Sequence, residues 1–83
     1  DSFPDLAVEV LVEGNTTQET DLKLRELFAA GTQLVWLVDP AAGTIEVCES
    51  ADRAAARVLR DGDTLDGGAV LPGFTVAVRH VLA

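Results

Sequence analysis

Apolar residues occupy both faces of the first segment of the chain. From Leu6 to Val12 the sequence reads LAVEVLV, and both the even and the odd positions are apolar except for Glu9. This pattern is typical of a strand that is covered on both sides in an α/β sheet. Pro4 lies just before it, where a missing backbone N–H is tolerated. We therefore predict a buried strand over residues 3–12.

A helix is predicted between this strand and the next apolar run. Thr16 is followed three residues later by Glu19, a capping-box pattern that marks a helix start. Gly31 stands where the left-handed residue of a helix end is expected. The predicted helix is about fourteen residues long, a common length. Its apolar stripe consists of Leu24, Leu27 and Phe28.

The run QLVWLVD at residues 33–39 predicts a second buried strand, which Pro40 ends. The segment PAAG predicts a hairpin turn, and the alternation from Thr44 to Cys48 predicts a third strand. A strand–helix–strand unit followed by a hairpin fits a parallel crossover with antiparallel additions. The predicted fold class is α/β, with a small mixed β-sheet and one main helix.

The later segments carry weaker patterns. Residues 54–60 predict a further strand, although the alanines there also permit a short helix. Residues 61–63 (DGD) predict a turn, and residues 71–74 (LPGF) predict another break. Residues 75–82 form an apolar tail. The length of 83 residues predicts one small domain.

Composition narrows the function classes. The chain carries 14 acidic and 6 basic residues, a net charge of -8. This argues against a nonspecific nucleic-acid binder, because neutralising phosphates needs Lys and Arg. A metal-dependent nuclease is compatible with it, since a cation can offset the acidic site. Cys48 is the only cysteine, and no apolar run is long enough to span a membrane, so we expect a cytoplasmic location without membrane contact.

Glu9 is the most informative residue for function. A carboxylate among apolar neighbours is costly to bury without a partner, so such groups are often paired, metal-bound or catalytic. The alternative is a strand-edge Glu that reaches solvent. Lys23 lies at the border of the helix's apolar stripe and could approach Glu9, or could be a surface lysine. Asp5 could be a second metal-side carboxylate, or a solvated strand-end residue.

Several motifs occur in a fixed order: PDLAVEVLV, KLRELFAAG, VWLVDP, T-x-E-V, GDTL and LPGF. In order and spacing they resemble the C-terminal half of the Uma-type putative restriction endonuclease family, within the PD-(D/E)XK nuclease superfamily. The resemblance extends from Pro4 to about Phe74. It implies part of a restriction-endonuclease-like fold. It also implies a divalent-metal-dependent DNA endonuclease that hydrolyses phosphodiester bonds with Mg²⁺.

The resemblance also implies roles for individual residues. Glu9 matches the metal-ligand Glu of the family's P-D-L-x-V-E-V strand. Leu11 stands at the usual position of the superfamily's lysine and cannot serve. Lys23 matches the lysine that this family places on the following helix, so Glu9 and Lys23 are the predicted catalytic residues. Glu9 and Asp5 are the predicted metal ligands.

Three departures from the family pattern bear on completeness. Residues 12–14 (VEG) replace a Ser-Pro-Ser-like turn, and Leu27 replaces a Tyr. The family also has an upstream strand with another metal-binding Asp, which has no counterpart here because the sequence begins at Asp1. Residues 1–83 are therefore expected to form a single truncated endonuclease-like domain with an incomplete site.

Two functions follow from these observations. The first is a metal-dependent endonuclease that acts on DNA. The second is a catalytically inactive remnant that acts as a homo-oligomerisation or protein-interaction module. A central strand without its neighbours leaves an open edge and an uncovered apolar face, which favours association. We therefore expect a homo-oligomer, formed as a dimer or by exchange of an element.

Overall fold

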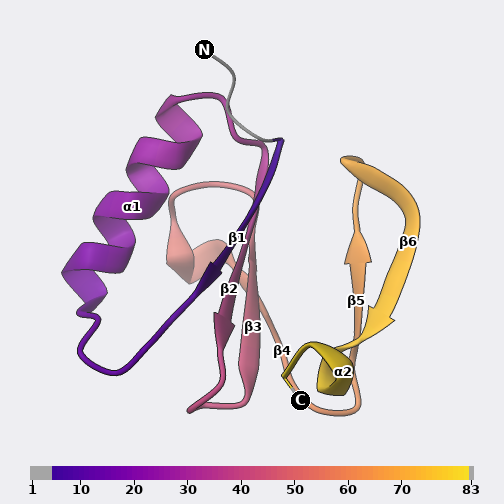
Figure 1. Cartoon of the computed structure of the whole chain (residues 1–83). Coiled ribbons are helices and arrows are strands. Elements are labelled where there is room, and N and C mark those ends of the chain that lie inside the picture. Colours follow the sequence, from indigo (N-terminus) through magenta and orange to yellow (C-terminus); the bar gives the residue numbers. More distant parts are fainter. Residues whose placement is uncertain (1–4, 83) are drawn as a thin grey trace.

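A four-stranded mixed sheet forms the centre of the molecule, with a helix on one face and a hairpin on the other (Figure 1). The computed structural model describes residues 5–82. The strand order is β1-β2-β3-β4; β1 runs parallel to β2, and the other neighbours are antiparallel. The strands are β1 (Leu6–Val10), β2 (Leu34–Asp39), β3 (Thr44–Cys48) and β4 (Arg57–Leu59). The predicted strand–helix–strand unit and hairpin are confirmed.

The main helix, α1 (Thr17–Ala29), begins and ends as the sequence predicts. The Glu19 N–H donates to Thr16 Oγ1 at 3.0 Å, and the Thr16 N–H donates to Glu19 Oε1 at 2.8 Å. This capping box satisfies two backbone groups that the helix start leaves without partners. At the other end, Gly31 has a φ of 109°, a conformation that favours glycine.

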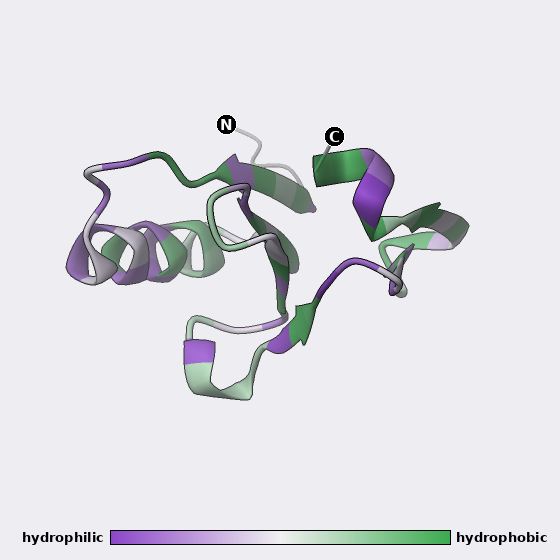
Figure 2. Cartoon of the chain, turned by 90° about the horizontal axis from the view of Figure 1, so that it is seen from below, coloured by the Kyte–Doolittle hydropathy of each residue, from purple (hydrophilic) through white to green (hydrophobic). Residues whose placement is uncertain are grey.

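Two apolar layers hold the sheet between its neighbours (Figure 2). The α1 layer packs Leu24 against the β2 residues Val35 and Leu37. The opposite layer centres on Trp36 and Ile45 and includes residues of the second sheet and the last helix. These C-terminal elements are β5 (Thr64–Gly67), β6 (Leu71–Ala77) and α2 (Val78–Leu82). None of the helices within residues 5–82 is long and apolar enough to cross a membrane.

The structure corrects the prediction that the first strand is covered on both sides. Phe3 and Pro4 lie outside the described residues, and β1 is an edge strand of its sheet. Its α1-facing residue Ala7 is buried, whereas Val8 and Val10 on the opposite face are more than half exposed. The reason is that the apolar layer formed with β5, β6 and α2 contacts Leu6 on this face of β1 and leaves Val8 and Val10 uncovered. Within residues 5–82, β2 is the one strand that pairs with β1.

Other differences lie in the second half of the chain. Residues 71–74 were expected to be a break, but they begin β6. Pro72 is accommodated there because β5 is the one strand within residues 5–82 that pairs with β6. The segment 54–60 contains both alternatives, a short 3₁₀ turn (Arg53–Ala55) followed by β4. The predicted apolar tail divides into the end of β6 and α2.

Candidate active site

Glu9 lies on β1 with its side chain on the face that α1 covers. It is in register with Leu37 of β2, whose side chain is buried beneath α1. The Glu9 side chain is 35% exposed, so its carboxylate lies at the margin of the apolar layer. Position and exposure together match neither a fully buried carboxylate nor a freely solvated one. The strand supplies a rigid backbone for this charge, because its parallel pairing with β2 runs from Leu6 to Val10.

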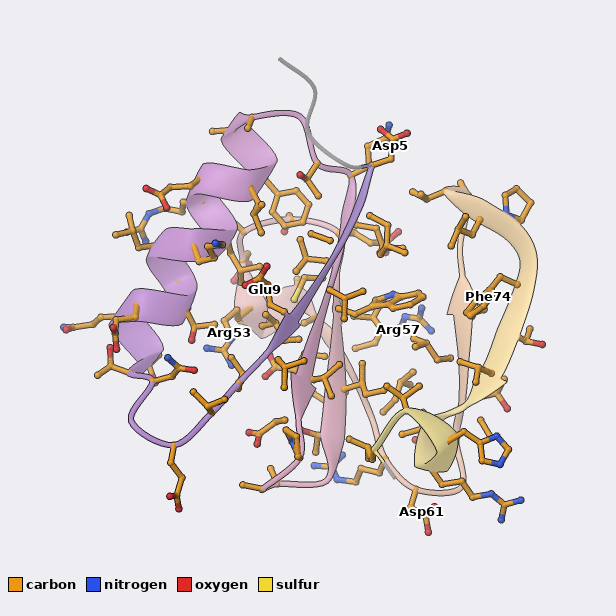
Figure 3. All side chains as sticks on the ribbon, viewed as in Figure 1. Asp5, Glu9, Arg53, Arg57, Asp61 and Phe74 are labelled. Atoms are coloured by element: carbon orange, nitrogen blue, oxygen red, sulfur yellow. The ribbon has the colours of Figure 1, made fainter. Side chains whose placement is uncertain are left out.

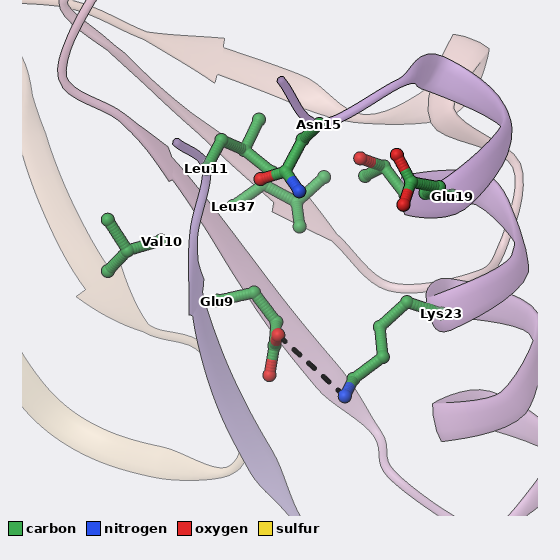
Figure 4. A pocket seen from close by; sticks show the side chains of 8 residues that line it. Glu9, Val10, Leu11, Asn15, Glu19, Lys23 and Leu37 are labelled. Carbon is green, nitrogen blue, oxygen red and sulfur yellow. Dashed lines mark ion pairs between the residues drawn. The ribbon is translucent and has the colours of Figure 1, made fainter. Parts of the chain in front are cut away.

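Lys23 approaches Glu9 from α1 (Figure 4). Its Nζ lies 4.0 Å from Glu9 Oε1, and its side chain is 52% exposed. An exposed ion pair at this distance contributes about 0–1 kcal/mol to stability, because water and salt screen it. The pair is therefore not needed to hold α1 on the sheet. Both charges remain available to a ligand that enters between them.

A cavity of about 210 Å³ lies between β1 and α1, with Glu9 and Lys23 in its wall. It is open to solvent and has a mixed lining, with Glu9 and apolar residues from β1, its C-terminal end and β2, and polar residues from the following loop and α1. The lining residues are Glu9, Val10, Leu11, Asn15, Glu19, Thr20, Lys23 and Leu37. The structure thus brings together the two residues that the sequence predicts to be catalytic, at one accessible place.

Three further polar residues of this cavity, Asn15, Glu19 and Thr20, had no predicted role in the site. Asn15 Oδ1 accepts a hydrogen bond from the Val12 N–H at 2.9 Å. This hydrogen bond closes the turn that follows β1 and holds the Asn15 side chain beside the strand. Glu19 uses Oε1 in the capping box, so its carboxylate is fixed at the helix start. A capping pattern signals a helix start, and it gave no indication that the same side chain also lines a cavity.

Asp5 lies at the other end of the strand from the cavity (Figure 3). Asp5 and Glu9 are four residues apart along extended backbone, which at about 3.3 Å per residue separates their Cα atoms by about 13 Å. Asp5 Oδ1 accepts a hydrogen bond from Gln33 Nε2 at 3.4 Å. The structure does not bring Asp5 and Glu9 together. Within residues 5–82, no group of three or more His, Cys, Asp or Glu side chains is arranged to hold a metal ion.

Arg53 stabilises the side of the molecule that carries α1. Its guanidinium donates two hydrogen bonds to Glu46 on β3, at 2.7 and 3.2 Å, and lies 3.7 Å from Asp21 on α1. The hydrogen bonds to Glu46 raise the pKa of Arg53. Asp21 is two residues before Lys23, so Arg53 holds the helix segment from which Lys23 projects. Sequence reasoning missed this residue because no local motif connects three elements.

The family assignment rests on a match that covers nearly the whole sequence. The family model Uma2, described as "Putative restriction endonuclease", matches residues 1–79. The chain belongs to the Uma2 family. This confirms the family that the ordered motifs indicated.

A solved structure shares the fold of this Uma2 chain. It is a putative nuclease belonging to DUF820 from Anabaena variabilis, with a TM-score of 0.77 and 16% sequence identity. The match covers 94% of this chain and 43% of that protein, so the Uma2 chain spans less than half the length of its structural neighbour. At this identity the likeness shows the fold. No curated protein matches the chain.

Proposed function

We propose that this Uma2 chain carries part of a divalent-metal-dependent endonuclease site that hydrolyses phosphodiester bonds in DNA. The observation that carries the proposal is the convergence of Glu9 and Lys23, 4.0 Å apart, on an accessible cavity. One comes from a strand and the other from a helix, so the sheet and the helix set their relative position. Family membership supports the reaction class.

Each of the two charges has a distinct task in such a site. In the hydrolysis, a water oxygen bonds to phosphorus while the bond from phosphorus to one sugar oxygen breaks, and negative charge accumulates on the phosphoryl oxygens. An ammonium group that is fixed beside those oxygens stabilises that charge, and this is the proposed role of Lys23. Glu9 is the proposed ligand of a divalent cation, which supplies a polarised water and charge neutralisation when it is bound.

The donor set of the described residues supports only part of a metal site. Magnesium sites generally combine one or two carboxylates with waters and phosphate oxygens. Glu9 supplies one carboxylate, and Glu19 in the same cavity is already engaged in the capping box. Asp5 is too far along the strand to share an ion with Glu9. Residues 5–82 of one chain therefore supply one carboxylate ligand of the proposed site, and the other ligands would be waters, phosphate oxygens or groups outside these residues.

The proposal is tested by plasmid cleavage in the presence of Mg²⁺ or Mn²⁺. Glu9→Gln and Lys23→Met are each expected to lower the cleavage rate by about 100-fold or more, because each removes a charge that acts on the reacting phosphate. Glu26→Gln and Arg25→Met are matched controls, since both side chains are exposed on α1 and lie outside the cavity lining. Cleavage that persists at an unchanged rate in Glu9→Gln would contradict the assignment of Glu9 to the active site.

Binding of Mn²⁺, followed by electron paramagnetic resonance, separates the two roles without relying on activity. Glu9→Gln is expected to weaken Mn²⁺ binding, because it removes a ligand. Lys23→Met is expected to leave binding intact or to tighten it, because it removes a positive charge beside that ligand. Weaker binding in the Lys23 variant, equal to that of the Glu9 variant, would contradict the separate roles.

A second candidate function is a non-catalytic association module. The observation that favours it is the exposed apolar face of β1, together with the single carboxylate of the cavity that is free of backbone partners. In this case the folded chain neither cleaves plasmid nor binds Mn²⁺, and it still self-associates. Cleavage that depends on both Glu9 and Lys23 excludes this candidate.

A further inference from the structure

Glu9 and Glu46 lie in one row across the central sheet, on the face that α1 covers. Glu9 of β1 is in register with Leu37 of β2, and Leu37 is in register with Glu46 of β3. Residues in register on neighbouring strands direct their side chains to the same face, and Leu37 is buried there together with Leu24 of α1. Because neighbouring strands are about 4.8 Å apart, the backbone positions of the two glutamates are about 10 Å apart.

Each of these two carboxylates is connected to α1 by an ion pair. On the β1 side, Lys23 of the helix lies 4.0 Å from Glu9 (Figure 4). On the β3 side, Arg53 donates two hydrogen bonds to Glu46 and lies 3.7 Å from Asp21 of the helix. The helix is therefore held to the sheet by charged contacts on both of its sides.

Asp21 and Lys23 lie on opposite flanks of α1. Successive residues of an α-helix are about 100° apart around the axis, so positions 21 and 23 are separated by about 200°. Between these flanks, Thr20 and Leu24 are buried against the sheet. Apolar burial is non-directional, so it fixes the distance of the helix from the sheet more firmly than the rotation of the helix about its own axis. An ion pair on each flank opposes that rotation.

We propose that Asp21 and Arg53 are positioning residues for Lys23, an inference that rests on the proposed endonuclease function. In the loaded site the Glu9 carboxylate is bound to the cation and the Lys23 ammonium faces the phosphate, so these two groups no longer pair with each other. The contact between Asp21 and Arg53 remains, because neither residue lines the cavity that contains Glu9 and Lys23. This contact then keeps α1 at the rotation that places Lys23 beside the phosphate.

The geometry and strength of the contact set the size of the expected effect. Side chains end about 6 Å from a helix axis, so a rotation of α1 by about 10° displaces the end of Lys23 by about 1 Å. A displacement of this size lowers the rate of a reaction that needs exact placement. The pair is partly exposed, with 39% of the Asp21 side chain and 24% of the Arg53 side chain accessible, and such pairs shift an equilibrium by up to about fivefold.

Asp21→Asn tests the positioning role, because it removes the contact and leaves the two hydrogen bonds between Arg53 and Glu46 in place. In plasmid cleavage kcat should fall by about two- to fivefold, with unchanged KM and unchanged Mn²⁺ affinity. Asp21→Glu restores a carboxylate and should recover most of the rate. The matched control is Glu26→Gln, which removes one negative charge from an exposed position on the same helix. Equal rates in Asp21→Asn and Glu26→Gln overturn the proposal.

A comparison in a second background tests Arg53 as the partner of Asp21. Arg53→Met together with Glu46→Leu removes the other two charges of the network. In that background Asp21→Asn should cause no further loss of kcat, because the contact is already absent. A further two- to fivefold loss, in the range of about one such pair, overturns Arg53 as the partner through which Asp21 acts.

Residual dipolar couplings of the backbone N–H groups measure the orientation of α1 against the sheet without metal or DNA. Glu9→Gln abolishes the ion pair with Lys23 and reproduces the loaded site in that respect. We expect α1 to keep its orientation in Glu9→Gln, and to reorient or lose order when Asp21→Asn is added. Glu9→Gln combined with Glu26→Gln is the control and should match Glu9→Gln alone. An unchanged orientation in the variant that lacks both ion pairs overturns the proposal.

The two measurements separate this inference from the proposed function. If the unmodified chain neither cleaves plasmid nor binds Mn²⁺, the proposed function fails, and reorientation of α1 in the dipolar couplings still supports the hold of Arg53 on the helix. If cleavage depends on Glu9 and Lys23 while Asp21→Asn behaves as its control does, the proposed function stands and the positioning role is overturned.

Discussion

Arg53 donates two hydrogen bonds to the Glu46 carboxylate, from Nη2 to Oε2 at 2.7 Å and from Nε to Oε1 at 3.2 Å. Both side chains are partly buried, with 24% and 17% of their surface exposed, so this pair is screened less than the Glu9–Lys23 pair. The guanidinium also lies 3.7 Å from Asp21 on α1. One side chain in the loop before β4 thus connects the helix to the sheet, and removing it isolates a partly buried carboxylate (Figure 3).

Arg53→Ala is expected to lower the free energy of unfolding by about 1–3 kcal/mol, because Glu46 then keeps its charge without a partner. Urea denaturation followed by circular dichroism measures the change. Arg25→Ala is the control, since Arg25 is exposed on α1, and its effect should stay within about 0.5 kcal/mol. The double variant Arg53→Met, Glu46→Leu should recover much of the loss, because neither charge remains buried. A double variant less stable than Arg53→Ala would argue against this account.

The elements predicted well from the sequence are those with local signals. Thr16 and Glu19 specify the start of α1, and the apolar run around Trp36 specifies β2, whatever the rest of the chain does. The same reasoning predicted part of the site. Glu9 stood out as a charged residue in an apolar strand. Its proximity to Lys23 required only that α1 pack against that strand.

The features that the sequence did not predict depend on contacts between distant elements. Pro72 and Gly73 predict an interruption of the strand from local sequence alone. β6 nevertheless tolerates them, because it pairs with one strand, β5, within residues 5–82. Val8 and Val10 read as core residues, and they are exposed because β5, β6 and α2 cover other strands. Arg53 carries no local signal at all, since its role arises only where α1, β3 and its own loop meet.

Thr16→Ala tests the helix start that positions the cavity. The variant loses the acceptor for the Glu19 N–H, and the expected cost is about 1 kcal/mol in the free energy of unfolding. Thr17→Ala is the matched control, because Thr17 is the neighbouring exposed threonine inside the helix and accepts no capping hydrogen bond. Urea denaturation of both variants measures the difference. Equal losses in the two variants would show that the capping box contributes nothing measurable.

The Cys48 thiol is expected to make stability fall in alkaline solution. Burial, with a further contribution from Glu46, raises the pKa of Cys48 from 9.0 to about 11. Between pH 9 and 11 the unfolded chain releases this proton and the folded chain keeps it, so unfolding becomes more favourable as the pH rises. The full effect is on the order of 2–3 kcal/mol by pH 11. Well below pH 9 the thiol is protonated in both states and contributes no slope.

Cys48→Ala separates this effect from the other groups that titrate in the same range. Urea denaturation at several pH values between 8 and 11 should give a steeper loss of stability for the unmodified chain than for the variant. The folded thiol should also react slowly with a water-soluble disulfide reagent at pH 8, because little thiolate is present and the side chain is buried. Parallel stability curves for the two proteins would contradict the shifted pKa.

Phe74 on β6 stacks on Trp36 of β2, with ring centroids 5.9 Å apart and an interplanar angle of 26°. This contact joins the C-terminal hairpin to the central sheet. Phe74 is 41% exposed, so Phe74→Ala should cost less than a fully buried phenylalanine, about 1–2 kcal/mol. Trp36 is the only tryptophan and the chain has no tyrosine, so its fluorescence reports the change directly. We expect its emission to shift to longer wavelength as water reaches the ring. Leu71→Ala is the control, because Leu71 is also 41% exposed on β6 and should leave the emission unchanged. An identical shift in both variants would mean that the emission follows general loosening of the hairpin, and the specific contact between the two rings would lose its support.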